Sequence, residues 1–395
     1  MVQLSLCMIV RNEAETLPRC LQSVSGIVDE AIVLDTGSTD LTVQVARSLG
    51  AQVYETLWHN DFALARNECL RHAQGEWVLV LDADEQFIRS QAPALPSLMA
   101  DPQHLVVNLV REEVGATQSP FSLVSRLFRR HPSLAFTRPY HAMIDDRVEE
   151  LLHQEPHWKV VTLAEPAIRH EGYKPGTIVA RDKFERARQA MEGFLGEHPR
   201  DVYTCTKLGA LQVEAGNWAT GTELLQRALG QSPQLPDLCY ELYYHLGIAA
   251  KRLGQTEEAI SYYQLAIEQA VLPLIKVGAY NNLGNLYEAQ GNLDAARSQY
   301  EMVVRLNPHL ALGYYNLGLI KKQKGDFWGA IASYQTAIRL KPDYTEAYQN
   351  LGVTFFKLGQ LPESIEAFQK AIVLHQKNEN LGEAQKLAHF LREIT

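Results

Sequence analysis

Residues 77–85 read WVLVLDADE, in which five apolar residues are followed by aspartates at positions i and i+2. A short apolar run of this kind is typical of a strand that is buried on both faces of a sheet. Asp82 and Asp84 follow the run directly, so both carboxylates can turn toward one point beyond the strand. Carboxylate oxygens suit Mg2+ or Mn2+, which commonly shares its coordination with a diphosphate. Because surface turns are also rich in Asp, the triplet needs support from its surroundings.

Two similar apolar runs precede this one. Residues 4–10 (LSLCMIV) end in the polar segment RNE, and residues 31–34 (AIVL) end at Asp35. Helix-like segments at 15–24 and 41–49 follow these runs, so strands alternate with helices. This alternation predicts an α/β fold with a parallel sheet covered on both faces, in which ligands bind at the carboxyl ends of the strands.

The second half of the chain contains a repeated pattern. A Leu-Gly pair recurs at intervals of 34 to 38 residues, beginning at Leu208, Leu246, Leu283, Leu317 and Leu351. Another glycine follows each pair, and then a small residue and a large apolar or aromatic residue at fixed distances. Small residues let two helices approach closely, while the large residue fills the space between helical hairpins. The pattern predicts an all-α solenoid of five hairpins.

Several segments, taken in order, resemble the nucleotide-sugar-binding half of the family 2 glycosyltransferases, which have the glycosyltransferase A fold. These segments are VRNE at 10–13, DTGSTD at 35–40, FALARN at 62–67 and DADE at 82–85. The helical pattern of the second half resembles tetratricopeptide repeats. The whole chain is therefore similar to bacterial family 2 glycosyltransferases that carry a tetratricopeptide C-terminus.

The resemblance and the repeats predict four parts of the chain. We expect a Rossmann-like, nucleotide-diphospho-sugar transferase domain over residues 1–175 and a linker helix over 176–201. Five tetratricopeptide repeats are expected over 202–378, followed by a capping helix over 379–395, because the open end of a solenoid needs a cap. The linker helix is expected to pack against both halves.

The resemblance implies donor-binding roles for residues at the predicted strand ends. Asp35 would hydrogen-bond the base or ribose of the nucleotide, with Asn12 and Glu13 lining the same pocket. Arg66 would face the diphosphate, because a guanidinium group suits phosphate oxygens. Asp82 would complete this set.

Structural alternatives remain open for these residues. Asp35 and Asp40 could shape a turn and cap the next helix. Arg66 could form a surface salt bridge, and Glu13 could be a charge at a helix N-terminus.

The resemblance also implies a divalent metal ion, Mn2+ or Mg2+, held by Asp82, Asp84 and His170. His170 lies in RHEGY at 169–173, which resembles the late His-x-Gly-Tyr segment of the family; a structural role for this histidine stays open. The segment SRLFRR at 125–130 resembles the family's Arg-Leu-Phe segment, which implies that Arg126 lies near the site. The alternative is that this segment is a run of solvated charges.

An inverting transfer, which the resemblance implies, needs a carboxylate that takes the acceptor's proton. Many relatives show His-Glu where this chain has His141 and Ala142, so the family's acid is missing here. Asp145 is our candidate for the base, with Asp146 and Glu149 nearby. A strongly nucleophilic acceptor such as a thiolate would need less help.

The inner helices of a tetratricopeptide array line a concave groove. The phase of the repeats predicts that the groove is lined by Tyr244, Asn281, Asn285, Glu288, Tyr315, Lys322 and Gln349. Asparagine side chains there can pair with the backbone of an extended peptide, so a protein or peptide is the expected partner. A solvated helix face is the alternative for each residue, and a homo-oligomer also remains open.

These predictions describe a metal-dependent glycosyltransferase that moves a sugar, such as a hexose on a UDP-linked donor, to a protein, peptide or glycan acceptor. The alternative is a scaffold whose first domain binds nucleotides or is inactive, which the missing acid favours. A nucleotidyltransferase would need an early glycine-rich loop, and residues 7–20 hold no glycine.

Composition sets the remaining limits. The chain has 395 residues, of which 46% are hydrophobic and 21% are charged, as in globular proteins. Its net charge of −9 argues against a nucleic-acid partner. The five cysteines form no CxxC pair, and no run reaches the roughly 18 apolar residues of a membrane span. No signal peptide is recognisable, so we expect a cytoplasmic protein, with peripheral contact at the inner membrane face left open.

Overall fold

The computed structural model describes residues 3–115, 120–140, 142–171, 177–233 and 235–394. The chain divides into two compact units. The first comprises Met1–Gly254 and Gln269–Ile275, and the second comprises Gln255–Glu268 and Lys276–Thr395. Each unit is described by itself below.

The described residues of the first unit form an eight-stranded mixed sheet with the order β3-β2-β1-β4-β7-β6-β8-β5. The strands are β1 (Leu4–Val10), β2 (Glu30–Asp35), β3 (Gln52–Glu55), β4 (Trp77–Val80), β5 (Glu85–Phe87), β6 (His104–Glu113), β7 (Phe121–Arg129) and β8 (Lys159–His170). Strands β3, β2, β1 and β4 are parallel; β1, β2 and β4 are the three predicted strands, and β3 was not predicted. The prediction of a fully parallel sheet is wrong, because β7 runs antiparallel to β4 and β6, and β5 runs antiparallel to β8.

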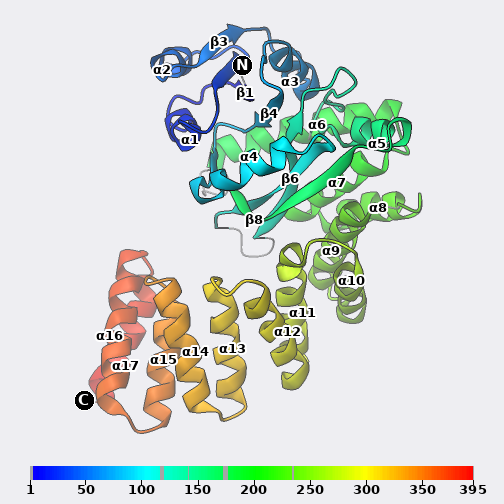
Figure 1. The fold of residues 1–395 in the computed structure, drawn as a ribbon. Helices are drawn as coiled ribbons and strands as arrows, with labels where there is room; N and C mark the ends of the chain where they lie inside the picture. The colour runs from blue at the N-terminus through cyan, green and yellow to red at the C-terminus, as the bar shows by residue number, and fades with distance from the viewer. Residues whose placement is uncertain (1–2, 116–119, 141, 172–176, 234, 395) are drawn as a thin grey trace. The chain divides into compact units, whose positions relative to one another are not determined.

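Helices cover both faces of this sheet (Figure 1). They are α1 (Leu17–Val24), α2 (Thr42–Ser48), α3 (Phe62–Arg71), η1 (Arg89–Ala94), α4 (Leu95–Ala100) and α5 (Asp145–Gln154). Side chains alternate along a strand, so Leu6 and Met8 of β1 pack in the cluster that contains Leu17 of α1, while Cys7 packs in the cluster that contains Cys69 of α3. The two cores hold the carboxyl ends of β1, β2 and β4 side by side.

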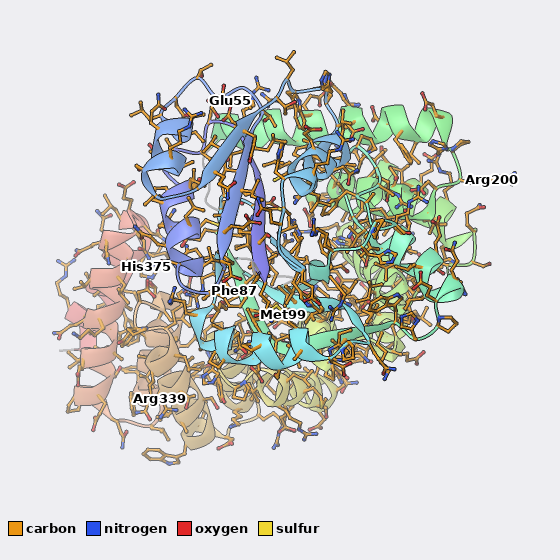
Figure 2. All side chains as sticks on the ribbon, turned by 45° about the horizontal axis from the view of Figure 1, so that its top comes forward. Glu55, Phe87, Met99, Arg200, Arg339 and His375 are labelled. Carbon is orange, nitrogen blue, oxygen red and sulfur yellow. The ribbon has the colours of Figure 1, made fainter. Side chains whose placement is uncertain are left out.

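One edge of the sheet is closed by the short strand β5. Phe87 of β5 and Met99 of α4 belong to the same buried cluster as the α1 residues, and Figure 2 shows both side chains. The pairing of β5 with β8 begins where Glu85 lies opposite His170. This register brings the end of β8 next to the DADE segment.

The first unit continues into a set of helices. They are α6 (Thr177–Glu197), α7 (Val202–Glu214), α8 (Trp218–Leu229) and α9 (Pro236–Arg252). Helices α7 and α8 approach closely at Gly209 and Gly221. A Cβ atom on Gly209 would lie 2.7 Å from Leu225, and one on Gly221 would lie 2.6 Å from Val213. The repeated small residues therefore allow the hairpin to close.

In the second unit, as in the first, glycines lie where paired helices approach closely. The α-helices of the second unit are α10 (Thr256–Glu268), α11 (Val277–Ala289), α12 (Leu293–Leu306), α13 (Ala311–Gln323), α14 (Phe327–Leu340), α15 (Thr345–Lys357), α16 (Leu361–Lys377) and α17 (Leu381–Ile394). A Cβ atom on Gly318 would lie 2.5 Å from the ring of Tyr334. The short helix η2 (Pro273–Lys276) lies at the division between the units. Helix α17 packs on α16 through Leu387 and Phe390.

The predicted fold class, an α/β transferase-like domain followed by a tetratricopeptide-like array, is confirmed. Along the described ranges, no helix is both long and apolar enough to span a bilayer.

Candidate functional site

Asp35 ends strand β2 and is almost completely buried, with 3% of its surface exposed. Its Oδ1 atom accepts hydrogen bonds from the backbone N–H groups of Gly37 (2.9 Å) and Ser38 (2.8 Å). These bonds shape the turn after β2. Its Oδ2 atom is buried and has no hydrogen-bond partner among the described residues. Buried carboxylate oxygens normally have a donor, so this atom is suited to a ligand that brings one.

Asn12 and Glu13 lie at the end of β1, beside the same turn. The backbone N–H of Asn12, which has a left-handed φ of 57°, donates to Ser38 Oγ at 2.8 Å. Its side-chain Oδ1 accepts from the backbone N–H of Thr39 at 2.8 Å. The side chain of Glu13 accepts from Thr16. Asn12 thus joins the ends of β1 and β2, and the donor-binding roles of Asn12 and Glu13 stay predictions.

Asp40 has a structural role. Its Oδ1 accepts from the backbone N–H of Thr42 at 3.0 Å, and its Oδ2 accepts from that of Ala14 at 3.3 Å. The hydrogen bond from the Thr42 hydroxyl is the main reason why the pKa of Asp40 is lowered.

Asp82 follows β4 and lies between two arginines. Its Oδ1 accepts from Nη2 of Arg66 at 2.8 Å, and its Oδ2 accepts from Nη2 of Arg126 at 2.9 Å. Burial by itself would raise the pKa of Asp82, but the charges of Arg126 and Arg66 outweigh it and hold the pKa well below its usual value. Arg66 was predicted to face the diphosphate, and Arg126 was expected near the site from the SRLFRR segment.

The two arginines have more hydrogen-bonding capacity than Asp82 uses. Arg66 is 8% exposed and its guanidinium lies over the ring of Phe136. Within the part of the chain that the structure describes, Nε and Nη1 of Arg66 and Nη1 of Arg126 are buried without a hydrogen-bond partner. Burial and the like charge of Arg126 lower the pKa of Arg66. Two cations with one carboxylate and three unpaired nitrogens suit an anion with several oxygens, such as a diphosphate.

Asp84 lies next to His170, on the neighbouring strand β8. The Nε2 atom of His170 is 3.3 Å from Oδ2 of Asp84, and its Nδ1 atom is 2.6 Å from Oε2 of Glu113. Burial alone would lower the pKa of His170, but hydrogen bonds with Asp84 and Glu113 raise it to about 9. A carboxylate on one ring nitrogen commonly orients a histidine whose other nitrogen binds a metal.

The residues predicted to hold a metal ion therefore fall into two places. Asp84 and His170 face each other and fit as a pair of ligands, whereas both oxygens of Asp82 bind arginines. No group of three or more His, Cys, Asp or Glu side chains in the described ranges is arranged to hold a metal.

Asp145, the candidate base, is the first residue of α5. It accepts a hydrogen bond from Ser125 Oγ of β7 at 2.7 Å. Burial raises the pKa of Asp145, which makes the carboxylate a stronger base. Ala142 packs at the edge of the core that contains α5, and Glu149 is exposed. His141 lies outside the described residues.

The residues predicted to line the groove contact other side chains of the helical array. Tyr244, in the first unit, is 2% exposed and stacks on Tyr240. The remaining ones lie in the second unit. Their partners, in order, are Asn281 with Asn316 (2.8 Å), Asn285 with Tyr300 (2.6 Å), Glu288 with Gln323 (2.6 Å), Tyr315 with Asn350 (3.1 Å), Lys322 with Asn350 (2.5 Å) and Gln349 with His375 (3.3 Å). These bonds tie neighbouring helices together.

Sequence reasoning missed Arg111 and Arg138. Arg111 binds the fully buried Glu85 (2.9 Å) and Glu113 (2.7 Å), and so supports both the DADE segment and the carboxylate behind His170. Arg111 stands in the apolar strand VVNLVREE, and a charge inside such a strand is a signal that could have identified it. Of the two carboxylates that Arg138 binds, Asp146 is 8 positions away and Asp201 is 63 positions away, so no local pattern joins all three residues.

Family models match most of the chain in separate pieces. The glycosyl transferase family 2 model matches residues 5–161, and tetratricopeptide repeat models match residues 238–309, 320–359 and 345–378.

Similar proteins have the same character. A TPR repeat-containing protein of Synechococcus elongatus is 45% identical over 301 residues, which is 75% of either chain. The SPbeta prophage-derived glycosyltransferase SunS of Bacillus subtilis is 28% identical over 198 residues, covering 49% of this chain and 45% of SunS. A glycosyltransferase of Rickettsia bellii is 26% identical over 219 residues, covering 52% of this chain and 73% of that protein.

The solved structures that resemble this chain include MamA and YrrB. The MamA protein matches 45% of this chain and 94% of its own with a TM-score of 0.39 at 23% identity. YrrB, described as a TPR protein with an unusual peptide-binding site, matches 51% of this chain and its full length with a TM-score of 0.41 at 17% identity.

Proposed function

The chain belongs to the bacterial family 2 glycosyltransferases that carry C-terminal tetratricopeptide repeats, and we propose that it transfers a sugar, such as a hexose, from a UDP-linked donor to an acceptor. The observation that carries this proposal is the pair of buried guanidinium groups of Arg66 and Arg126, which flank Asp82 and keep three nitrogens without partners among the described residues. A diphosphate supplies oxygens for these nitrogens and offsets the excess positive charge.

The nucleotide would lie across the ends of β2 and β4. The buried Oδ2 atom of Asp35 accepts a hydrogen bond from the base or the ribose, because it has no other donor in the described part of the chain. Asn12 and Glu13 keep the end of β1 against this turn. Arg66 and Arg126 then bind the phosphates, which places the anomeric carbon of the sugar beyond the end of β4.

Asp84 and His170 are the residues that would hold Mn2+ or Mg2+ beside the phosphates. A bound divalent ion supplies a positive charge that stabilises the departing diphosphate. Glu113 and Arg111 orient His170, which keeps its Nε2 atom toward Asp84.

The reaction proposed is an inverting substitution. A hydroxyl or thiol of the acceptor attacks the anomeric carbon, the bond from this carbon to the phosphate oxygen breaks, and its electron pair leaves with the nucleoside diphosphate. The carboxylate of Asp145 takes the acceptor's proton, and the raised pKa of Asp145 favours this step. Arg66 and Arg126 stabilise the charge that develops on the leaving group.

The tetratricopeptide repeats are proposed to bind a protein or peptide, either the acceptor or a partner. A second candidate function is an interaction scaffold whose first domain binds a nucleotide without transfer. Ala142, where many relatives have the acid, favours this candidate.

Thermal unfolding of the purified chain with Mn2+ and a panel of nucleoside diphosphates tests the proposal, because a ligand of the native state raises its apparent stability. UDP is expected to raise the melting temperature, and UDP-glucose or UDP-N-acetylglucosamine is expected to be hydrolysed slowly. Arg66→Gln should remove the shift with UDP. Arg71→Gln, which alters an exposed arginine on the same helix, should keep it.

Each outcome has one meaning. If no nucleoside diphosphate stabilises the unaltered chain, the proposed donor site is wrong. Binding without hydrolysis of, or transfer from, any nucleotide-sugar favours the scaffold.

A further inference from the structure

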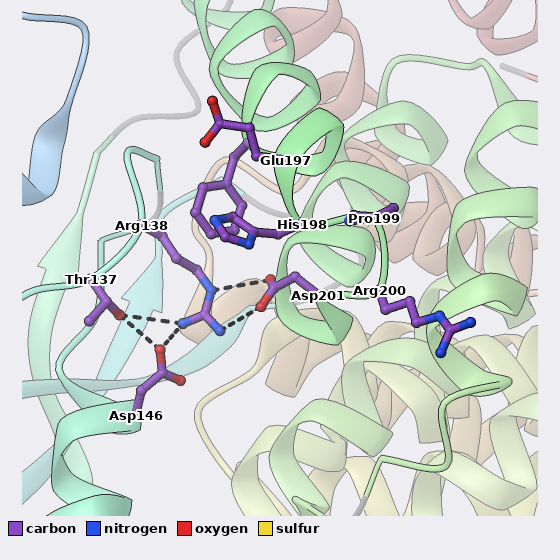
Figure 3. A pocket seen from close by; sticks show the side chains of 9 residues that line it. Thr137, Arg138, Asp146, Glu197, His198, Pro199, Arg200 and Asp201 are labelled. Carbon is purple, nitrogen blue, oxygen red and sulfur yellow. Dashed lines mark hydrogen bonds and ion pairs between the residues drawn. The ribbon is translucent and has the colours of Figure 1, made fainter.

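Arg138 connects the beginnings of two helices in the first unit. Its Nε and Nη2 atoms donate to Oδ1 (3.2 Å) and Oδ2 (2.9 Å) of Asp201, and its Nη1 atom donates to Asp146 (Figure 3). Its guanidinium also lies 4.8 Å from the ring centre of Tyr203. The side chain is 11% exposed. All three nitrogen atoms of this guanidinium therefore donate hydrogen bonds to carboxylates of the protein.

Each of the two carboxylates belongs to a different helix start. Asp201 caps α7, the first repeat helix, by accepting from the backbone N–H of Thr204 at 2.7 Å. Asp146 is in the first turn of α5, directly after the candidate base Asp145. Burial by itself would lower the pKa of Arg138, but these two carboxylates raise it, so the link stays charged.

The backbone around Arg138 reaches the donor site. Arg138 has a φ of 69°, a left-handed conformation that few residues other than glycine adopt and that persists only where surrounding contacts fix it. Phe136, two residues earlier, lies under the guanidinium of Arg66. Thr137 bonds with both Met143 and Asp146. The segment 136–138 thus touches the phosphate-facing arginine on one side and the start of α5 on the other.

We propose that Arg138 is a positioning residue of the transfer reaction, which fixes the start of α5, and with it Asp145, against the first repeat helix. The inference rests on the proposed function. It makes the first repeat a part of the catalytic machinery, because the carboxylate of Asp201 that holds Arg138 belongs to the N-cap of α7.

Charge gives this role a measurable consequence. Asp145 is surrounded by Asp146 on α5, by Lys207 and Tyr203 on α7, by Asp237 on α9 and by the hydroxyl of Ser125 on β7. The nearby charge of Asp146 raises the proton affinity of Asp145, and Arg138 offsets that charge. Loss of Arg138 should therefore raise the pKa of Asp145. A base acts only when deprotonated, so the acidic limb of the rate profile should move to higher pH.

The surroundings of Arg138 allow a second measurement. Arg138 lines a cavity of about 640 Å3, whose wall also includes Phe194. Figure 3 shows two further wall residues, His198 and Pro199. His198 and Pro199 are exposed, so the cavity is open to solvent. In an Arg138→Ala variant, ethylguanidinium can enter this cavity and occupy the place of the missing side chain.

The test uses the full chain with Mn2+ and either UDP-glucose or UDP-N-acetylglucosamine, with water as the acceptor. Arg138→Ala should lower kcat of hydrolysis about 10-fold to 100-fold, as small displacements of reacting groups do. KM for the donor and the Kd of UDP should stay within about twofold, because the donor contacts remain. Ethylguanidinium at millimolar concentration should restore part of kcat, and Arg138→Lys should retain part of it.

Two further variants separate positioning from folding. Asp201→Asn keeps the size of the side chain and should also lower kcat, but by a smaller factor than Arg138→Ala does. Arg147→Ala removes an exposed arginine of α5 that pairs with Glu150, and should leave kcat and the pH profile unchanged.

An Arg138→Ala protein with unaltered kcat overturns the inference alone. The inference is also overturned if the Arg138→Ala protein loses kcat and melts at a lower temperature, but shows no shift of the pH profile and no rescue by ethylguanidinium. That pattern is expected of a residue with a purely structural role. A parent chain that neither binds UDP nor hydrolyses any donor overturns the proposed function, and this inference with it.

Discussion

The Nε2 atom of His170 lies 3.3 Å from Oδ2 of Asp84, although the two residues are 86 positions apart in the chain. The antiparallel pairing of β5 with β8 explains this contact, because it sets Glu85 opposite His170. Glu113 holds the other ring nitrogen at 2.6 Å, so the imidazole cannot turn away from Asp84 without losing that bond. The sheet register thus brings together two residues from segments that are far apart in the sequence.

Asp84→Asn and His170→Gln should weaken activation by Mn2+. Each substitution removes one of two proposed ligands, so we expect the Mn2+ concentration that gives half-maximal donor hydrolysis to rise about 10-fold to 100-fold. Titration of hydrolysis with Mn2+ measures this. His104→Gln is the control, since His104 is bound elsewhere, to the carbonyl of Leu98. Equal titrations for all the proteins would remove Asp84 and His170 from the proposed metal site.

The metal-free protein should lose stability as the pH rises from 6.5 to 9. The pKa of His170 rises from 6.5 to about 9 on folding. The stability that its protonated form contributes is therefore complete below pH 6.5 and is lost as the pH passes about 9. We expect the free energy of unfolding to fall by about 1–3 kcal/mol over this range. Urea unfolding in EDTA at several pH values measures it, and a slope that persists in His170→Gln would assign it to other groups.

Asp82→Asn should destabilise the fold and alter its response to anions. The substitution leaves the buried guanidinium groups of Arg66 and Arg126 without their shared carboxylate, so we expect a loss of about 2–3 kcal/mol in the free energy of unfolding. Pyrophosphate should raise the free energy of unfolding of this variant by more than it raises that of the parent chain. Asp61→Asn is the control, because Asn caps α3 as well as Asp does. A fully stable Asp82→Asn protein would mean that the two arginines do not depend on Asp82.

Gly318→Ala should destabilise the second unit. The new Cβ atom would lie 2.5 Å from the ring of Tyr334, so the helices of that repeat must separate, at about 1–3 kcal/mol. Gly382→Ala, on α17, meets nothing within 4 Å and should be neutral or stabilising, since Ala favours helix over Gly. Thermal unfolding of both variants checks this, and a similar loss in both would show that space around Gly318 does not limit packing.

Much of the architecture was predictable from short-range pattern. The apolar runs at β1, β2 and β4 predicted buried strands, and the spacing of glycine and aromatic residues predicted the helical repeats. The antiparallel strands β5 and β7 were not predictable, because their direction depends on long-range pairing. The candidate residues at the strand ends were found from the same short-range pattern, because each one directly follows an apolar run.

The partners of those candidates were harder to infer. The motif containing Asp82 predicts an acidic side chain at the end of a strand, but it does not reveal that Arg66 and Arg126 bind both of its oxygens. The link from Arg138 to Asp201 spans 63 positions and depends on how α7 docks on the transferase fold. Such ion pairs are set by tertiary packing and leave no periodic trace.

The first compact unit extends through α9 to Gly254, well past the end of the sheet. The hairpin of α7 and α8 therefore belongs to the same compact unit as the sheet, whereas the helices from α11 onward belong to the second unit. Duplication or deletion of a hairpin in the second unit would remove none of the carboxylates that Arg138 binds, because Asp146 and Asp201 both belong to the first unit.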